Sequence, residues 1–331
     1  MALQTRREWL TRVAPRNELV NVLEFEAEAE RILSADLFRV LSGGDRAAFD
    51  RITFRPRMMV NCLDLNLSLD LVGMPLFAPI VVGPVTDQRR FHPDGELATV
   101  RGASAAQAAV VVSSRSSHSV QAMAAQATTP LIFQAFAEDG ATKIRSQAQE
   151  AERAGCKAVF ITIGTPEAGA RRSTRLDWAA LDALRGAVSV PVMVKGVMTA
   201  LDSTTAVTHG AQGLVVSNYG RTAAPGQPAP LDAVAPIVDA VGPQVPVLLD
   251  GGIRRGSDVM KALASGARAV LVARPVMWGL AAYGADGVQS VVEMLQTELG
   301  RVMGCCGTPN LAVITRRVMT IHAAQPTRER V

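Results

Sequence analysis

From residue 79 onward, short runs of apolar, largely β-branched residues alternate with longer segments in which apolar residues recur at helical spacing. The short runs lack a polar face, which is typical of strands that are buried on both sides in a parallel sheet. Eight strands are therefore predicted, at residues 79–84, 109–114, 131–136, 158–163, 190–196, 213–218, 245–252 and 269–275. Helices are predicted between and after them, at residues 96–108, 142–154, 176–187, 231–241, 259–265 and 284–303.

This order of elements predicts an α/β fold with a parallel sheet and helices outside it. Eight strand and helix units close naturally into a (β/α)8 TIM barrel. An open, doubly wound sheet is the competing architecture. We favour the barrel because no G-x-G-x-x-G sequence follows the first strand.

Three regions are expected along the chain. Residues 1–70 form an N-terminal helical extension packed on the barrel, with one helix predicted over residues 24–41. Residues 71–312 form the barrel itself. Residues 313–331 are expected to be a charged C-terminal tail.

Composition narrows the class of protein. The chain has 331 residues, 48% of them hydrophobic, and a net charge of +4 that is spread along the sequence, so we expect no nucleic-acid partner. We also expect no membrane partner, because no apolar run reaches the roughly 18 residues of a membrane span and residues 1–10 lack the apolar core of a signal peptide. A cytoplasmic location is expected.

Four cysteines are present, and Cys305 and Cys306 are adjacent. A redox or metal pair is one interpretation of these two. Two unpaired thiols are favoured because no C-x-x-C or cysteine–histidine spacing accompanies them, so no metal site is predicted.

In a barrel, residues at the carboxyl ends of all eight strands meet at one mouth, where this fold keeps its chemistry. Here those residues are polar and rich in cations. The last two units carry Gly251-Gly252, Arg254 and Arg274, and the loops after strands seven and eight are the usual phosphate site of the fold. Glycines let backbone N–H groups approach an anion, and arginines bind phosphate oxygens in pairs. A phosphorylated ligand is thus predicted, with solvated surface arginines as the alternative.

The chain resembles the FMN-dependent α-hydroxy acid oxidase and dehydrogenase family over roughly residues 21–312. The resemblance rests on the residue runs 45–51 (DRAAFDR), 92–96 (HPDGE), 194–197 (VKGV), 217–218 (SN), 249–256 (LDGGIRRG) and 273–275 (ARP). It implies a homo-oligomer, tetrameric by family analogy. It also implies FMN as the cofactor, bound by Pro84, Val85, Thr86, Ser113, Gln134, Thr162, Lys195, Ser217, Asp250, Gly252, Arg254, Ala273 and Arg274. Among these, Lys195 is expected beside the N1 and O2 edge of the flavin.

On the substrate side the sequence departs from the family. Tyr219 stands where the family has the histidine that accepts the substrate's proton while hydride passes to flavin N5. Tyrosines expected at the third strand and in the N-terminal helix are Phe136 and Val40. The family's long connection between strands four and five is also largely deleted.

The remaining substrate residues implied by the resemblance are cationic. Arg171 occupies the position of a substrate-carboxylate arginine, Arg115 replaces an aromatic residue after strand two, and Arg221 lies one step from a second carboxylate-binding arginine position. We therefore assign Tyr219, Lys195 and Arg171 to catalysis, and Arg171, Phe136, Arg115 and Arg221 to substrate binding.

The favoured function is an FMN-dependent oxidoreductase that oxidises an α-hydroxy acid or a larger anionic substrate by hydride transfer to flavin N5, with an atypical substrate site. A tyrosine hydroxyl has an ordinary pKa about three units above that of histidine, so it is the poorer base by roughly 4 kcal/mol. One alternative is therefore an FMN-dependent reductase, isomerase or lyase in which Tyr219 donates a proton. The other is a flavin-binding protein without catalysis.

Overall fold

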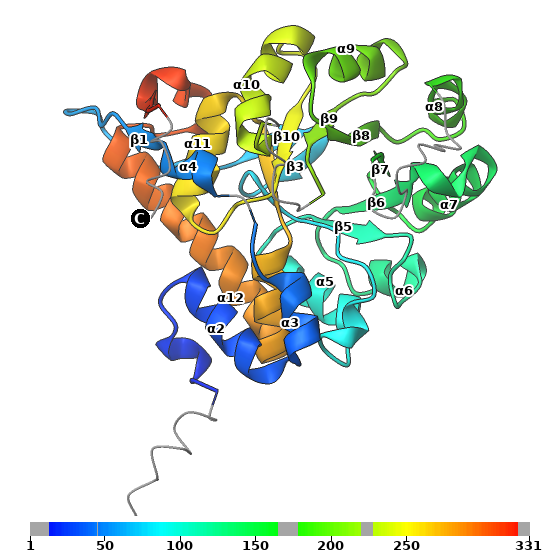
Figure 1. The fold of residues 1–331 in the computed structure, drawn as a ribbon, viewed down its shortest axis with the longest axis horizontal. Helices are drawn as coiled ribbons and strands as arrows, with labels where there is room; N and C mark the ends of the chain where they lie inside the picture. Colours follow the sequence, from blue (N-terminus) through cyan, green and yellow to red (C-terminus); the bar gives the residue numbers. More distant parts are fainter. Residues whose placement is uncertain (1–12, 45, 165–177, 220–227, 324–331) are drawn as a thin grey trace, which may run out of the picture.

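A computed structural model describes residues 13–44, 46–164, 178–219 and 228–323 of the chain. Eight parallel strands close into a barrel in the order β10-β11-β4-β5-β6-β7-β8-β9, which confirms the predicted TIM barrel (Figure 1). Each predicted strand is present: β4 (Ile80–Val82), β5 (Val110–Ser113), β6 (Leu131–Phe136), β7 (Ala158–Thr162), β8 (Val192–Val197), β9 (Leu214–Val216), β10 (Val247–Asp250) and β11 (Ala269–Val272).

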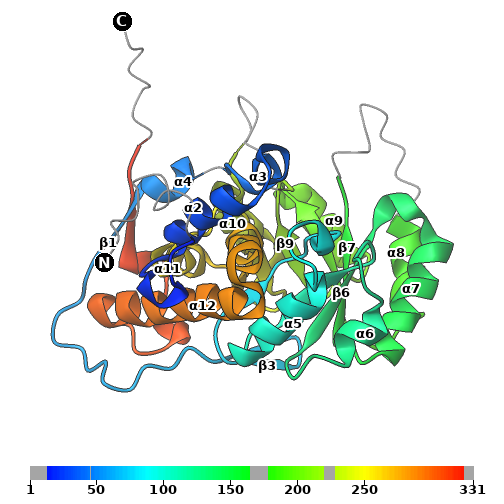
Figure 2. The ribbon, with the colours of Figure 1, turned by 90° about the horizontal axis from the view of Figure 1, so that it is seen from below.

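The strands are buried on both faces because successive side chains serve two different cores. Val111 of β5 points into the barrel, whereas Val110 and Val112 pack against the surrounding helices. A hairpin of β2 (Leu69–Leu71) and β3 (Met74–Leu76) adds its buried side chains to the interior core. Figure 2 shows β3 below the barrel and α3 (Ala35–Leu41) on the opposite side, so the hairpin covers the end away from the mouth.

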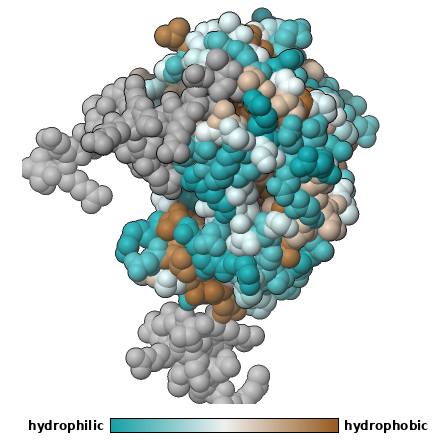
Figure 3. All heavy atoms as spheres, turned by 90° about the vertical axis from the view of Figure 1, so that its right-hand side faces the viewer, coloured by the Kyte–Doolittle hydropathy of each residue, from teal (hydrophilic) through white to brown (hydrophobic). Residues whose placement is uncertain are grey.

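Helices surround the barrel where the sequence predicted them, and two short helices, α6 and α9, were not predicted. Helix α7 buries only Ile144, Ala148 and Ala151, one stripe at helical spacing, and presents polar residues elsewhere. The face that carries α6, α7 and α8 is accordingly largely hydrophilic (Figure 3). The helices of this outer layer are α5 (Gly95–Ala105), α6 (Val120–Ala124), α7 (Ala141–Arg153), α8 (Trp178–Arg185), α9 (Ala200–Thr208), α10 (Pro230–Val241) and α11 (Gly256–Ser265).

The single helix predicted over residues 24–41 is wrong. Two helices are present, α2 (Val22–Ile32) and α3, and the chain between them is extended at Leu33 and Ser34. The hydroxyl of Ser34 accepts a hydrogen bond from the backbone N–H of Leu37, so this residue caps α3 instead of continuing α2.

After α4 (Ala47–Asp50), strand β1 (Ile52–Phe54) pairs antiparallel with β12 (Met319–Ile321). This pairing joins the segment after α4 to the C-terminal end of the described chain, beside α11 (Figure 1). The predicted domain boundaries remain a prediction.

The final helix, α12 (Arg274–Cys306), begins earlier than predicted and contains a kink. Tyr283 and Gly284 have non-helical backbone angles, and Gly284 has φ 58°, a region that favours glycine. The predicted helix over 284–303 is therefore the second half of α12, while the first half starts directly after β11 and brings Arg274 to the barrel mouth. None of the described helices is long and apolar enough to cross a membrane.

Candidate active site

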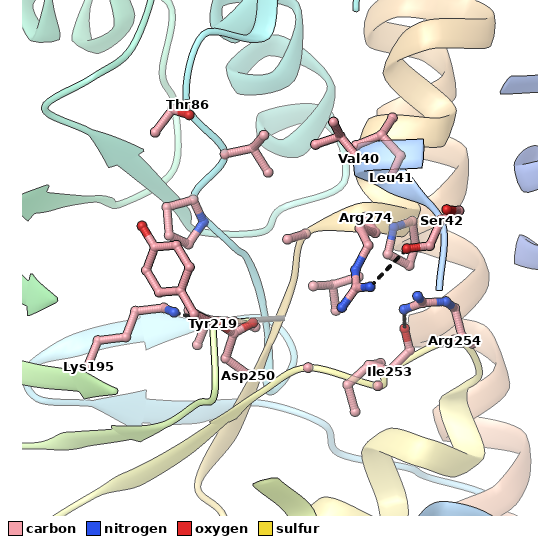
Figure 4. Close-up of a pocket in the computed structure, with 18 of the residues that line it drawn as sticks. Val40, Leu41, Ser42, Thr86, Lys195, Tyr219, Asp250, Ile253, Arg254 and Arg274 are labelled. Carbon is pink, nitrogen blue, oxygen red and sulfur yellow. Dashed lines mark hydrogen bonds and ion pairs between the residues drawn. The ribbon is translucent and has the colours of Figure 1, made fainter. Parts of the chain in front are cut away.

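A cavity of about 370 Å³ opens at the carboxyl ends of the strands, within the size range of small-molecule sites (Figure 4). The loops after β4 and β11, the ends of β8 and β10, the turn after β9 and the end of α3 all contribute to its wall. Of the predicted site residues, the following line it: Pro84, Val85, Thr86, Gln134, Lys195, Tyr219, Asp250, Gly252, Arg254, Ala273 and Arg274.

Two arginines define one end of the cavity. The Arg254 side chain is buried and stacks 4.7 Å from the centre of the Trp278 ring. Within the described parts of the chain it donates hydrogen bonds only to backbone oxygens, those of Ile253 at 2.8 Å and Gly43 at 2.9 Å. Arg274 donates to the carbonyl of Ser42 at 3.2 Å.

Burial and the neighbouring charge of Arg274 lower the pKa of Arg254 to about 10, and burial also lowers the pKa of Arg274. Among the described residues, no carboxylate lies within 4 Å of the Arg254 guanidinium. Next to these cations Gly251 has φ 112°, and a side chain added there would meet nothing within 4 Å, so the backbone is open to a ligand. One buried and one half-buried cation, beside an open glycine turn and the start of α12, fit an anionic phosphate.

A buried charge pair defines the other end of the cavity. The Lys195 ammonium, on β8, lies 2.6 Å from an Asp250 carboxylate oxygen and donates a hydrogen bond to the Ser217 hydroxyl at 3.1 Å. Ser217 in turn donates to Asp250 at 2.8 Å. Three neighbouring strands, β8, β9 and β10, thus present one lysine, one hydroxyl and one carboxylate that fix each other's orientation.

Tyr219 adopts a backbone conformation that is uncommon for a residue with a side chain. Its φ is 63°, and its N–H donates to the Ser217 hydroxyl at 3.1 Å, which holds the turn after β9. The Lys195 ammonium lies 5.3 Å from the centre of the Tyr219 ring. Figure 4 shows the ring above Lys195, with the phenolic oxygen pointing away from that ammonium.

Three predicted cofactor residues lie next to the cavity wall and not among its lining residues. Thr162 accepts a hydrogen bond from the Gln134 amide at 2.6 Å, and Ser113 pairs with Gln134 in the β5–β6 register. Ser217 is the third and bonds to Lys195. Thr162 and Ser217 thus orient side chains that reach the cavity. The Ser113 hydroxyl instead accepts a hydrogen bond from the backbone N–H of Arg115.

Phe136 and Arg115 form a unit of their own. Phe136 is fully buried, and the Arg115 guanidinium stacks 3.9 Å from the centre of its ring. Arg115 also pairs with Glu138 at 2.5 Å and lies 3.8 Å from Asp139. Neither residue is among those that line the cavity. The predicted substrate residues Arg171 and Arg221 lie outside the described residues.

Several lining residues were not predicted. Arg39 comes from α3, Ser42 directly follows that helix, and Arg90 comes from the short 3-10 helix η2 (Gln88–Arg90). Val40, where the family was expected to have a tyrosine, also lines the cavity and is half exposed. No local sequence pattern marks Arg39 as part of the mouth, although the family resemblance assigns its neighbour Val40 to the substrate side.

A closed barrel with two neighbouring arginines beyond its last two strands is typical of TIM-barrel proteins that bind a phosphorylated ligand at the mouth. The FMN-dependent dehydrogenase family matches residues 42–175 and 171–321 of the chain. The chain belongs to the FMN-dependent dehydrogenase family, and it is an FMN-dependent oxidoreductase.

Named relatives agree with this placement. The chain is 32% identical to peroxisomal (S)-2-hydroxyacid oxidase GLO4 of Arabidopsis thaliana, over 91% of this chain and 96% of that protein. It is 33% identical to glycolate oxidase of Spinacia oleracea, over 90% and 95% respectively. A crystal structure of mandelate oxidase with (S)-2-phenylpropionate superimposes with a TM-score of 0.85 at 33% identity, covering 92% of this chain and 99% of the other.

The alignment with the Arabidopsis protein spans 348 positions yet covers only 91% of this 331-residue chain, so that relative carries residues with no counterpart here. The two segments matched by the family meet at residues 171–175. That is where the sequence predicts a shortened connection between strands, and this stretch lies outside the described residues.

Proposed function

We propose that this protein oxidises an α-hydroxy acid or a larger organic anion at the mouth of the barrel, with Tyr219 in the position of the proton acceptor. The observation that carries the proposal is the meeting of Lys195, Tyr219, Arg254 and Arg274 in one cavity. The relatives' names, which describe oxidases of glycolate, 2-hydroxyacids and mandelate, support the same class of substrate.

The cation end of the cavity would hold the phosphate of FMN. Arg254 and Arg274 supply paired donors, and the backbone at Gly251 and Gly252 supplies close approach. Bound FMN supplies the redox chemistry by accepting two electrons and a proton equivalent as hydride. At the other end Lys195, fixed by Asp250 and Ser217, would place positive charge beside the redox-active edge of the ring.

Tyr219 would accept the substrate's hydroxyl proton at its phenolic oxygen. The Lys195 ammonium lies 5.3 Å from the centre of the ring and pairs with Asp250, and the phenolic oxygen points away from it (Figure 4). The left-handed backbone at Tyr219 keeps its ring at the cavity wall.

Substrate anions would be bound by Arg171, with Arg221 as a second donor. Arg115 is a weaker candidate for this role, because a substrate carboxylate must compete with Glu138 and Asp139 for the same guanidinium. Phe136 and Val40 in place of tyrosines remove two hydroxyls. The site would therefore bind a bulkier, less polar acid than glycolate.

The reductive half-reaction tests this function. Purified holoprotein is mixed anaerobically with a panel of α-hydroxy acids of increasing size, and bleaching of the flavin absorbance is recorded. Tyr219→Phe keeps the ring and removes the proton acceptor, so bleaching is expected to slow at least about a hundredfold, within the usual contribution of a general base. Tyr219→His is expected to speed it up, because histidine is the better base at neutral pH.

Other outcomes separate the alternatives. Bleaching by no acid, in the wild type or in Tyr219→His, contradicts the proposal and favours a binding protein without catalysis. Turnover without net redox change, or only after prior reduction of the flavin, favours a reductase, isomerase or lyase.

We further propose that the chain acts in the cytoplasm as a homo-oligomer, tetrameric by analogy with its family, without a nucleic-acid or membrane partner. The described cysteines are free thiols, which is consistent with a reducing compartment, whereas peroxisomal is part of the Arabidopsis relative's name. Light scattering of the purified holoprotein and fractionation of cells that express it test these two statements.

A further inference from the structure

A buried carboxylate outside the predicted site joins two loops at the barrel mouth. Glu96 is the second residue of α5 and is only 2% exposed. One of its carboxylate oxygens accepts hydrogen bonds from the backbone N–H groups of Gln88 and Ser117, both at 3.0 Å, and from the Ser117 hydroxyl at 3.4 Å. Gln88 follows β4 and Ser117 follows β5, so this one oxygen ties the two loops together.

The side chain of Gln88 extends the same contacts to the cavity wall. Its amide nitrogen donates to the carbonyl of Val85 at 3.1 Å, and its amide oxygen accepts from the Thr99 hydroxyl at 2.6 Å. Gln88 and Thr99 are both buried. Val85 lines the cavity, as does Arg90 at the end of η2. Glu96 does not line the cavity itself, and it contacts the loop from Pro84 to Arg90 through Gln88.

The loop needs such support because its backbone is strained. Asp87 has φ 49°, in the left-handed region that residues with a side chain seldom adopt. Its N–H donates to the carbonyl of Arg115 at 3.1 Å, and its carboxylate accepts from Ser117 at 3.2 Å. A strained turn persists only where its surroundings fix it, and here those surroundings meet at Glu96.

The second oxygen of Glu96 indicates that the acid is retained for a reason other than packing. This atom is buried and has no hydrogen-bond partner among the described residues. A buried, unsatisfied carboxylate oxygen costs stability, whereas the charge strengthens every bond that the first oxygen accepts. The start of α5 offsets part of the cost through its dipole.

We propose that Glu96 is a positioning residue that fixes the loop Pro84–Arg90 against the flavin, and so sets both FMN affinity and turnover. The expected effect on turnover rests on the proposed function. The expected effect on FMN affinity requires only that the protein binds FMN.

Two variants test it. Glu96→Gln is isosteric and keeps one oxygen acceptor but removes the charge, and Glu96→Ala removes the acceptor. The matched control is Glu28→Gln, because Glu28 is also a buried glutamate that accepts a hydrogen bond from a backbone N–H, that of Ala14, but its hydrogen bonds within the described residues go to Ala14 and Arg31 and not to the loop Pro84–Arg90. For each variant FMN dissociation constants, the visible circular dichroism of the bound flavin, thermal stability, kcat and KM are measured.

We expect Glu96→Ala to weaken FMN binding at least about tenfold and to lower kcat by about ten- to a hundredfold with little change in KM, since misplacement by 1 Å has effects of that size. Glu96→Gln should show the same pattern more weakly, with an altered flavin dichroism. Glu28→Gln should lower stability alone.

The inference is overturned if Glu96→Gln and Glu96→Ala lose stability as Glu28→Gln does while FMN affinity and flavin dichroism stay at wild-type values. If Glu96→Ala does not fold, Glu96→Gln decides the matter by the same measurements. If the proposed function is wrong, the wild-type protein will bind FMN but no acid will bleach the flavin. That result would leave the expected effect of Glu96 on FMN affinity unchanged.

Discussion

Replacing Arg254 by methionine should leave the stability of the apoprotein nearly unchanged while it weakens the binding of FMN. The pKa of Arg254 is lowered from 12.5 to about 10, first by burial and second by Arg274. That difference corresponds to roughly 3 kcal/mol by which the fold disfavours the charged guanidinium. Because the folded pKa is below the unfolded one, this penalty is fully present at neutral pH and disappears as the pH rises through 10 toward 12.5.

Favourable contacts of the same side chain offset the penalty. Hydrogen bonds from the charged guanidinium to the carbonyls of Gly43 and Ile253 contribute about 1.5 kcal/mol each, the lower end of the range for a charged donor, and stacking on Trp278 adds about 0.5–1 kcal/mol. Methionine keeps much of the contact with the Trp278 ring. Apoprotein carrying Arg254→Met should therefore unfold within about 1 kcal/mol of the wild type, as the burial penalty and the lost contacts nearly cancel.

The same substitution should weaken FMN binding strongly. A hydrogen bond to a charged group contributes about 1.5–3 kcal/mol, so the dissociation constant should rise between about ten- and 150-fold. Urea unfolding of the apoprotein gives the stability, and quenching of FMN fluorescence on titration gives the affinity. Arg255→Met is the matched control, because Arg255 pairs with Glu298 on the surface and does not line the cavity.

Two results would refute this reasoning about Arg254. One is an apoprotein that loses several kcal/mol, which would mean that the guanidinium stabilises the fold without its ligand. The other is an FMN affinity that changes no more than it does in Arg255→Met, which would place the phosphate elsewhere.

Further predictions concern packing and thiols. Gly279→Ala should destabilise the protein by about 1–3 kcal/mol, because a Cβ there would lie 2.4 Å from the carbonyl oxygen of Gly287 across the α12 kink. Gly304→Ala should stabilise it by about 0.5–1 kcal/mol, because a Cβ at that position meets nothing within 4 Å. Equal effects of the two substitutions in thermal unfolding would contradict this prediction. Burial raises the pKa of the Cys156 thiol from 9.0 to about 12, so wild-type stability should fall relative to Cys156→Ala as the pH rises from 9 to 12, by roughly 1.4 kcal/mol per pH unit. A flat difference between the two pH profiles would count against it. Exposed Cys305 should react with a thiol reagent in the folded protein while Cys156 does not, and simultaneous labelling would show that the fold opens there.

The sequence was a good guide to the barrel because the relevant signal is local. A strand buried on both faces has no polar positions, and eight such runs separated by helical segments admit few arrangements. The cavity residues at strand ends, such as Lys195, Asp250 and Arg254, followed from the same rule, since parallel strands end at one edge. The break at Ser34 was missed because a serine can continue a helix or cap the next one, and its hydrogen bond to Leu37 decides which.

What the sequence determined by itself was the fold class and the cofactor family, because each follows from residue types at fixed positions along the chain. The assignment of Tyr219 to the position of the family's histidine stays a prediction. The tertiary structure alone decided what lies beside each of those positions. It placed Arg39 and Arg90 at the cavity, stacked Arg115 on Phe136 beside Glu138, and bonded Glu96 to the cavity-lining loop after β4. These contacts join segments far apart in sequence, and their energies depend on burial and distance, which no local pattern of residues records.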